Sequence, residues 1–310
     1  MKKGVILILS ILAIIFLIML IGFSSITRHN QNSSNSSVSS SDNSNEYGCS
    51  LKNPCHKDFE CVNKRCMLIL NSNLGNCKIS GSEAECISKN VVIKAPSNNL
   101  DFISKNVQVL QYQYDFLLDY LDFEPNTKII YQEFVSDVSK YCSSNALGCA
   151  IGDHTYWPVE ILNPNNTKWV IEDHEFNHAF WSDINLNHDL NEAFARYLSL
   201  KESEYANGYD SVLDFLKPHY RIIGYFFTIN EENWKSMIDL PASDACKTLS
   251  VRQMEGENAQ NASLQCQYYF NLVKYNQRNL AENLLKDAFD KKIDISTKEN
   301  VDKQMNAYFD

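Results

Sequence analysis

Two histidines and a glutamate within one short segment could bind a metal ion. His174, Glu175 and His178 form the run His-Glu-Phe-Asn-His, and neither proline nor glycine interrupts residues 168–182. Helical residues four apart share a face, so both imidazoles can point at one spot, with Glu175 beside it. Two imidazoles and a carboxylate are a common ligand set for catalytic zinc, which keeps a fourth position for water. The run therefore predicts a zinc site on a helix.

The third ligand has to come from another element. Residues 183–190 are rich in Asn and Asp and predict a polar turn, and the apolar spacing of residues 191–200 predicts a second helix. A short turn favours an antiparallel helix pair, which would bring Glu192 back beside the histidines. We predict Glu192 as the third ligand, with His188 and Asp189 in the turn as alternatives. The three-histidine set of metzincins is excluded, because the chain has Trp181 and Ile184 where that motif needs glycine and histidine.

The run His174–His178 followed by Asn-Glu-Ala-Phe-Ala at residues 191–195 resembles the gluzincin metallopeptidases, which include thermolysin, the zinc aminopeptidases and the peptidase MA-like proteins. The resemblance covers the motif core and, loosely, residues 100–230. It implies that His174, His178 and Glu192 bind one zinc ion and that Glu175 is the general base. Thermolysin-like enzymes carry an acidic residue one turn after the third ligand, which orients a zinc histidine. Arg196 stands there in this chain, so the orienting residue must lie elsewhere.

The resemblance also implies further parts of the machinery. Glu175 would take a proton from a zinc-activated water and pass it to the leaving amine. Tyr220 is the candidate donor to the developing oxyanion, although it precedes Gly224 by four residues where relatives have three, and packing is an equally good explanation of its presence. An upstream edge strand, at Cys149–Asp153 or Val159–Leu162, would pair with the substrate backbone.

Composition limits the class of protein. The chain has 310 residues, 44% of them hydrophobic, and a net charge of -10. Its lysines and arginines form no cluster larger than a pair, which argues against nucleic acid as a partner. A peptide or protein substrate is compatible with this surface, and nothing in the sequence indicates an oligomeric state.

Ten cysteines predict a disulfide framework and therefore an oxidising compartment. Three pairs are close enough in sequence to close local loops: Cys77 with Cys86, Cys142 with Cys149, and Cys246 with Cys266. Another four are tightly clustered at Cys49, Cys55, Cys61 and Cys66, and their pairing stays open. A structural zinc site in that cluster is the alternative, but no Cys-x2-Cys knuckle supports it.

The N-terminus predicts a membrane anchor. Lys2 and Lys3 precede an apolar run from Val5 to Phe23, which at roughly 20 residues is long enough to span a bilayer. The lysines orient the N-terminus towards the cytoplasm and the rest of the chain away from it. A retained anchor is favoured over a cleaved signal peptide, whose apolar core is usually shorter.

We predict an α+β protein in four parts: a transmembrane signal anchor at residues 1–23, a Ser/Asn-rich disordered stalk at 24–46, a cysteine-rich module at 47–87, and a metallopeptidase-like domain at 98–310. Within that domain we expect a helix at 106–121, a strand at 127–134 and short strands near 148–162. A zinc-binding helix pair and a helical lobe from about residue 203 would follow.

These features together predict a membrane-anchored, outward-facing zinc metallopeptidase that hydrolyses peptide bonds. One alternative is a non-enzymatic, disulfide-rich surface or adhesion protein that retains an inactive fold of this kind. The other is a chance motif on a core helix, in which the two histidines would be ordinary packed side chains.

Overall fold

The computed structural model describes residues 49, 54–62, 65–70, 76–126, 128–143, 146–162, 173–208, 240–248, 259–276 and 279–309. All of them belong to one compact unit, residues 45–310. The predicted anchor at 1–23, the predicted stalk at 24–46 and Tyr220 lie outside the described residues. Among the described helices, none is both long enough and apolar enough to cross a membrane.

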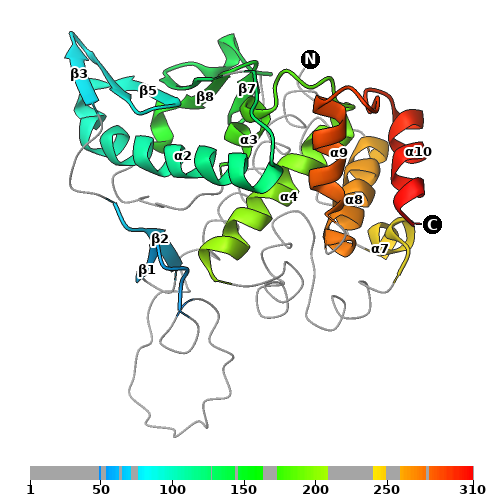
Figure 1. Ribbon diagram of the computed structural model, residues 1–310. Helices are drawn as coiled ribbons and strands as arrows, with labels where there is room; N and C mark the ends of the chain where they lie inside the picture. Colours follow the sequence, from blue (N-terminus) through cyan, green and yellow to red (C-terminus); the bar gives the residue numbers. More distant parts are fainter. Residues whose placement is uncertain are drawn as a thin grey trace, which may run out of the picture. The chain divides into compact units, whose positions relative to one another are not determined.

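The described part of the chain is α+β, as predicted, and is built on a mixed six-stranded sheet (Figure 1). Its strands, in spatial order, are β3 (Asn76–Ser80), β4 (Glu83–Ile87), β5 (Val91–Pro96), β6 (Ile130–Val135), β8 (His154–Pro158) and β7 (Cys149–Ile151). β3, β4 and β5 form an antiparallel meander, β5, β6 and β8 are parallel neighbours, and β7 runs antiparallel to β8 at the edge.

Helix α2 (Leu100–Leu121) connects the parallel strands β5 and β6, which no tight turn could join. Most of its buried apolar residues recur at intervals of three and four: Ile103, Val107, Leu110, Tyr114, Leu117 and Leu121. This face packs on the sheet, since α2 contacts β4 and β5. The predicted helix at 106–121 is thus confirmed, and it begins six residues earlier than expected because Leu100 and Ile103 also join the core.

Helices dominate the rest of the described chain. They are α3 (His174–Phe180), α4 (His188–Ala206), α7 (Ala242–Thr248), α8 (Ala259–Lys274), α9 (Leu280–Phe289) and α10 (Lys298–Phe309). Helix α8 packs along α4, and the Cys246–Cys266 disulfide joins α7 to α8. One hydrophobic core runs from the sheet through α3 and α4 to α10, so the helices and the sheet form a continuous packing unit.

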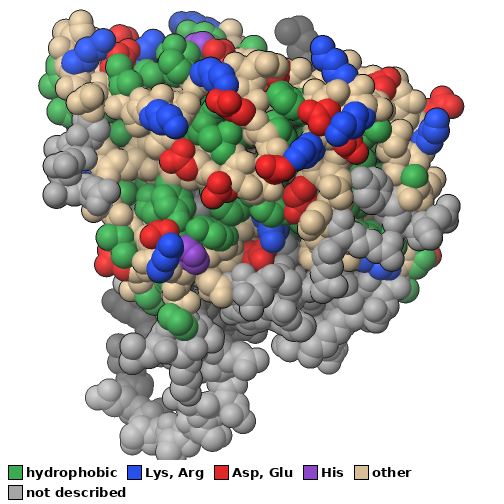
Figure 2. All heavy atoms as spheres, in the orientation of Figure 1, with side chains coloured by type: hydrophobic (Ala, Val, Ile, Leu, Met, Phe, Trp, Pro, Cys, Tyr) green, Lys and Arg blue, Asp and Glu red, His purple; other side chains and the backbone are tan. Residues whose placement is uncertain are grey.

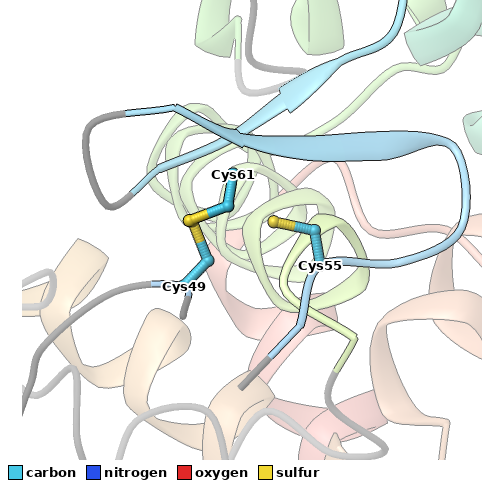
Figure 3. Close-up of side chains that lie close together, drawn as sticks. All are labelled: Cys49, Cys55 and Cys61. Atoms are coloured by element: carbon cyan, nitrogen blue, oxygen red, sulfur yellow. A yellow bond between two sulfur atoms is a disulfide. The ribbon is translucent and has the colours of Figure 1, made fainter. Parts of the chain in front are cut away.

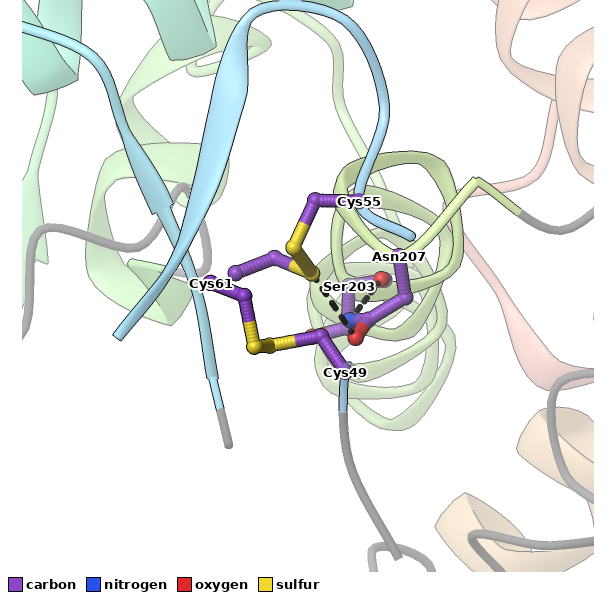
Figure 4. The surroundings of a disulfide bond; sticks show 6 residues. Cys49, Cys55, Cys61, Ser203 and Asn207 are labelled. Carbon is purple, nitrogen blue, oxygen red and sulfur yellow. Dashed lines mark hydrogen bonds between the residues drawn. A yellow bond between two sulfur atoms is a disulfide. The ribbon is translucent and has the colours of Figure 1, made fainter. Parts of the chain in front are cut away.

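The N-terminal cysteines stabilise a small hairpin of β1 (Phe59–Val62) and β2 (Arg65–Leu68). Two disulfides hold it together: Cys49–Cys61, which Figure 3 shows, and Cys55–Cys66. The hairpin rests on the end of α4, where the amide of His56 donates to Ala206 O at 3.0 Å. Beside this bond, Asn207 Oδ1 lies 3.3 Å from the Cys66 sulfur (Figure 4). The hairpin is therefore packed against the helices rather than separated from them.

The three local disulfides predicted from spacing all form. All ten cysteines are paired, which leaves no thiolate for the alternative zinc site in the N-terminal cluster. Residues 76–87, grouped above with the cysteine-rich module, form β3 and β4 of the six-stranded sheet, where Cys77 and Cys86 are cross-strand partners. Five disulfides are typical of an extracytoplasmic protein.

Acidic and basic side chains are interspersed over the described part of the face in Figure 2. No large area of one charge stands out there. This distribution matches the sequence, in which the basic residues are scattered.

Candidate metal centre

Helix α3 starts at a well-defined position because two residues hold its first turn. Asp173 is the N-cap, and its carboxylate accepts from the amide of Phe176 at 3.1 Å. Gln113 of α2 bonds the backbone of Asp173 on both sides: its Nε2 donates to Asp173 O at 3.1 Å, and its Oε1 accepts from Asp173 N at 3.3 Å. The first turn of α3, which carries His174, is therefore fixed by the long helix α2.

Helix α4 is tied to α3 by a buried amide. Asn177 is fully buried, and its Nδ2 donates to Ala195 O at 3.3 Å and to Ser199 Oγ at 3.2 Å. Further along α3, Trp181 bonds Asn191, which lies earlier in α4. Later residues of one helix thus meet earlier residues of the other, which is the antiparallel pairing expected from the short turn.

This pairing brings His174, His178 and Glu192 together. The two Nε2 atoms lie 3.1 Å apart, and each lies 3.3 Å from a different carboxylate oxygen of Glu192. A tetrahedral zinc ion with bonds of roughly 2.0–2.1 Å separates its ligand atoms by about 3.3 Å. The two imidazole nitrogens have nearly this spacing, each has a carboxylate oxygen at this distance, and one ligand atom from each of the three residues lies within 4.8 Å of the others, so the residues present fit this metal.

Asn191 sets the protonation of His178. The indole N–H of Trp181 donates to Asn191 Oδ1 at 2.7 Å, and because an indole nitrogen can only donate, the amide oxygen must face it. His178 Nδ1 lies 3.1 Å from the same oxygen and therefore carries the hydrogen. The lone pair of the neutral ring is then on Nε2, which faces His174 and Glu192.

Asn191 thus orients His178, a role for which the sequence offered no acidic residue at position 196. The sequence interpretation did not identify Asn191. No local signal marked it, because Asn191 only precedes Glu192 near the start of α4 and consecutive helical residues do not share a face.

The pKa values of the two histidines shift in opposite directions: burial opposes the charged form of His178, but the hydrogen bond to Glu192 and its charge outweigh burial and raise the pKa of His178. Burial lowers the pKa of His174 to about 4, so the ring is neutral near pH 7, as a metal ligand must be. Burial also raises the pKa of Glu175 to about 7, against the opposing effects of His178 and of a bond from the Ala150 amide. Burial raises the pKa of Glu192 too, but the hydrogen bonds to both histidines outweigh it and hold that pKa far below its usual value.

The edge strand β7 borders this site. Its register pairs Cys149 with Tyr156 and Ile151 with His154 of β8, while the Ala150 amide donates to the Glu175 carboxylate. β7 is the terminal strand of the sheet among the described residues, and since alternate residues of such a strand direct their backbone groups outward, its outer edge at Ala150 faces Glu175. The other candidate edge, Val159–Leu162, is not a strand, because residues 159–161 form a 3-10 helix.

The alternative third ligands are directed elsewhere or stand apart. The Asp189 carboxylate accepts from Gln265 Nε2 at 3.2 Å and so points towards α8. Among the residues that the structure describes, His174, His178 and Glu192 form the one group of possible ligands that disulfides do not use, and His188 is not part of it. Glu192 therefore completes the group, as predicted from its place in the first turn.

A comparison of the chain with models of known protein families found no match, and a search of curated proteins also found none. The functional interpretation depends on the residues and their geometry.

Proposed function

We propose that this protein is a zinc-dependent metallopeptidase of the gluzincin type, anchored to a membrane by residues 1–23 and acting outside the cytoplasm. The observation that carries the proposal is the convergence of His174, His178 and Glu192 with ligand spacing, next to Glu175 and the outer edge of β7. The five disulfides support the location.

His174 Nε2, His178 Nε2 and the Glu192 carboxylate would hold the ion. When bound, zinc supplies a Lewis acid and a site at which water ionises near pH 7. Glu175 does not belong to the ligand group, and its carboxylate would accept the proton of the attacking water. A pKa near 7 suits a group that must take up this proton and then give it to the leaving amine.

The substrate that fits this arrangement is an extended peptide. Its backbone would add to the outer edge of β7, where the Ala150 amide already donates to Glu175 and the remaining main-chain groups would hold the peptide largely independently of its sequence. The Cys142–Cys149 disulfide ties the start of this strand to the segment that follows β6. A short edge strand held in this way would present its backbone groups in a constant position beside Glu175.

The test pairs metal analysis with cleavage of a peptide library by the purified full chain. The parent should contain one zinc ion per chain and cleave peptides. Glu175→Gln should keep the zinc and lose roughly 10²–10⁴-fold in activity, the usual contribution of a general acid–base group. Glu83→Gln, an exposed position on β4, is the matched control and should behave as the parent.

Two results would oppose the proposal. A parent protein without stoichiometric zinc would refute the proposed metal site. Equal cleavage by the parent and Glu175→Gln would refute the role of Glu175 as the general base. Zinc binding without cleavage of any peptide would instead indicate the alternative, a surface protein that keeps the metal site but not the activity.

A further inference from the structure

A buried line of polar side chains leads from Glu192 to helix α8. Arg196, one turn after Glu192, places NH2 3.6 Å from Glu192 Oε2 and donates from NH1 to Gln265 Oε1 at 3.1 Å. Gln265 in turn donates from Nε2 to Asp189 Oδ1 at 3.2 Å. The Gln265 residue is 1% exposed and the Arg196 side chain 10%.

The orientation of the Gln265 amide is fixed by its two partners. A guanidinium can only donate and a carboxylate can only accept, so the oxygen must face Arg196 and the nitrogen Asp189. Both partners lie on α4, two turns apart, and the amide on α8 bridges them. The guanidinium is consequently held in place by a helix other than its own.

The held position matters because Arg196 and a metal ion would compete for the same carboxylate. At 3.6 Å, the Arg196 nitrogen lies beyond the usual N–H···O distance of about 2.7–3.2 Å from Glu192 Oε2. A guanidinium that could move closer would form a bidentate pair with the carboxylate, an arrangement that arginine strongly favours. Glu192 would then be less available to a cation beside the histidines.

We propose that Gln265 is a positioning residue of the metal site: by holding Arg196 back from Glu192, it keeps that carboxylate available as the third ligand. The inference rests on the proposed zinc site and extends it to a helix 60 or more residues further along the chain. Arg196 still lies close enough to balance the negative charge of Glu192 when no metal is bound.

The experiment measures zinc affinity of the full chain by competition with a chromophoric chelator, in the parent and four variants. Gln265→Met is neutral like the parent side chain but cannot bond Arg196, and zinc binding should weaken roughly 10–100-fold, as is typical when a group that supports a ligand is lost. Gln267→Met is the matched control, because Gln267 bonds only to Ser263 of its own helix in the contacts described.

The decisive variants remove the competing cation. Arg196→Met should bind zinc at least as tightly as the parent, and Gln265→Met/Arg196→Met should recover the affinity that Gln265→Met loses. A role in packing alone would leave the double variant as weak as Gln265→Met. The absorption spectrum of Co²⁺ bound at saturation should show a changed ligand set in Gln265→Met and the parent spectrum in the double variant.

The proposal is overturned if Gln265→Met binds zinc as tightly as the parent, or if the double variant stays as weak as Gln265→Met. Thermal unfolding of each metal-free variant identifies a general loss of folding. A parent that binds no zinc would refute the proposed metal site, and this inference with it. A parent that binds zinc with unchanged affinity in Gln265→Met would refute this inference alone.

Discussion

Removing the Asn191 side chain should weaken both the fold and the metal site, by separable amounts. In Asn191→Ala, the indole N–H of Trp181 loses its acceptor at 2.7 Å, and Trp181 is a buried residue, 1% exposed. A buried donor without a partner costs about 1–3 kcal/mol. The free energy of unfolding of the metal-free protein should fall by about that amount.

The effect of Asn191→Ala on zinc affinity comes through His178. Without the acceptor at 3.1 Å from Nδ1, the ring can carry its proton on Nε2 and donate it to Glu192, whose oxygen lies 3.3 Å away. That tautomer has no lone pair for a metal ion, so part of the protein is unable to bind until the proton moves. We expect zinc affinity to fall about 10–100-fold, which corresponds to about 1.4–2.7 kcal/mol.

Urea unfolding of metal-free protein and chelator competition for zinc measure the two effects separately. Asn191→Asp keeps an oxygen for both donors and should bind zinc at least as tightly as the parent. Trp181→Phe removes the indole donor and one of the two restraints on the Asn191 oxygen, so stability should fall, and zinc affinity should fall less than in Asn191→Ala because that oxygen can still accept from His178 Nδ1. If Asn191→Ala bound zinc as tightly as the parent, the argument about the tautomer of His178 would be incorrect.

Three further predictions follow from other parts of the structure. Burial raises the pKa of Asp173 from 3.8 to about 6, so the folded state binds a proton more tightly than the unfolded state, and the stability of the metal-free protein should fall as pH rises from about 4 to about 6. Asp173→Asn keeps a capping oxygen and removes this dependence, so above pH 6 its free energy of unfolding should exceed that of the parent by at most about 3 kcal/mol. Urea unfolding at pH 4.5 and pH 7 measures this difference, and the same pH dependence in both proteins would contradict the prediction. A Cβ at Gly148 would lie 2.7 Å from the Trp157 ring, so Gly148→Ala should destabilise by about 1–3 kcal/mol, and a double-mutant cycle with Trp157→Leu should show that the two changes are coupled rather than additive. Dialysis against a chelator should lower the melting temperature by several degrees. Added Zn²⁺ should restore the melting temperature, whereas Mg²⁺ should not, because Mg²⁺ prefers oxygen ligands. Equal recovery with both ions in calorimetry would argue against a site with two imidazoles.

Several features of the site follow from local patterns. The four-residue spacing of His174 and His178 places both rings on one helix face whatever the rest of the chain does. The predicted polar turn at 183–190 is short enough to favour an antiparallel neighbour, and the structure forms that pair through Asn177, with α4 already beginning at His188. Likewise, the Cys77–Cys86 and Cys142–Cys149 bonds close short loops, so sequence distance was enough to predict them.

The choice among neighbouring residues of α4 was not local. Asp189, Asn191 and Glu192 all lie in its first turns, and each faces a different partner: α8, the Trp181–His178 edge of α3, and the imidazoles of His174 and His178. Which face of a helix meets which neighbour depends on how the helices pack, and hydrophobic spacing identifies a buried face without identifying what covers it.

From its sequence alone, this protein is determined to be an α+β, disulfide-bonded chain with two histidines on one helical face and a carboxylate one short turn away, because covalent spacing and backbone periodicity act over a few residues. Only the tertiary structure decided that Glu192 rather than Asp189 meets those histidines, that Asn191 sets the proton on His178, that the outer edge of β7 faces Glu175, and that Gln265 reaches Arg196. These contacts join residues that are far apart in the chain or that compete for the same neighbour, and only the packing of α2, α4 and α8 around α3 and the sheet brings them into place.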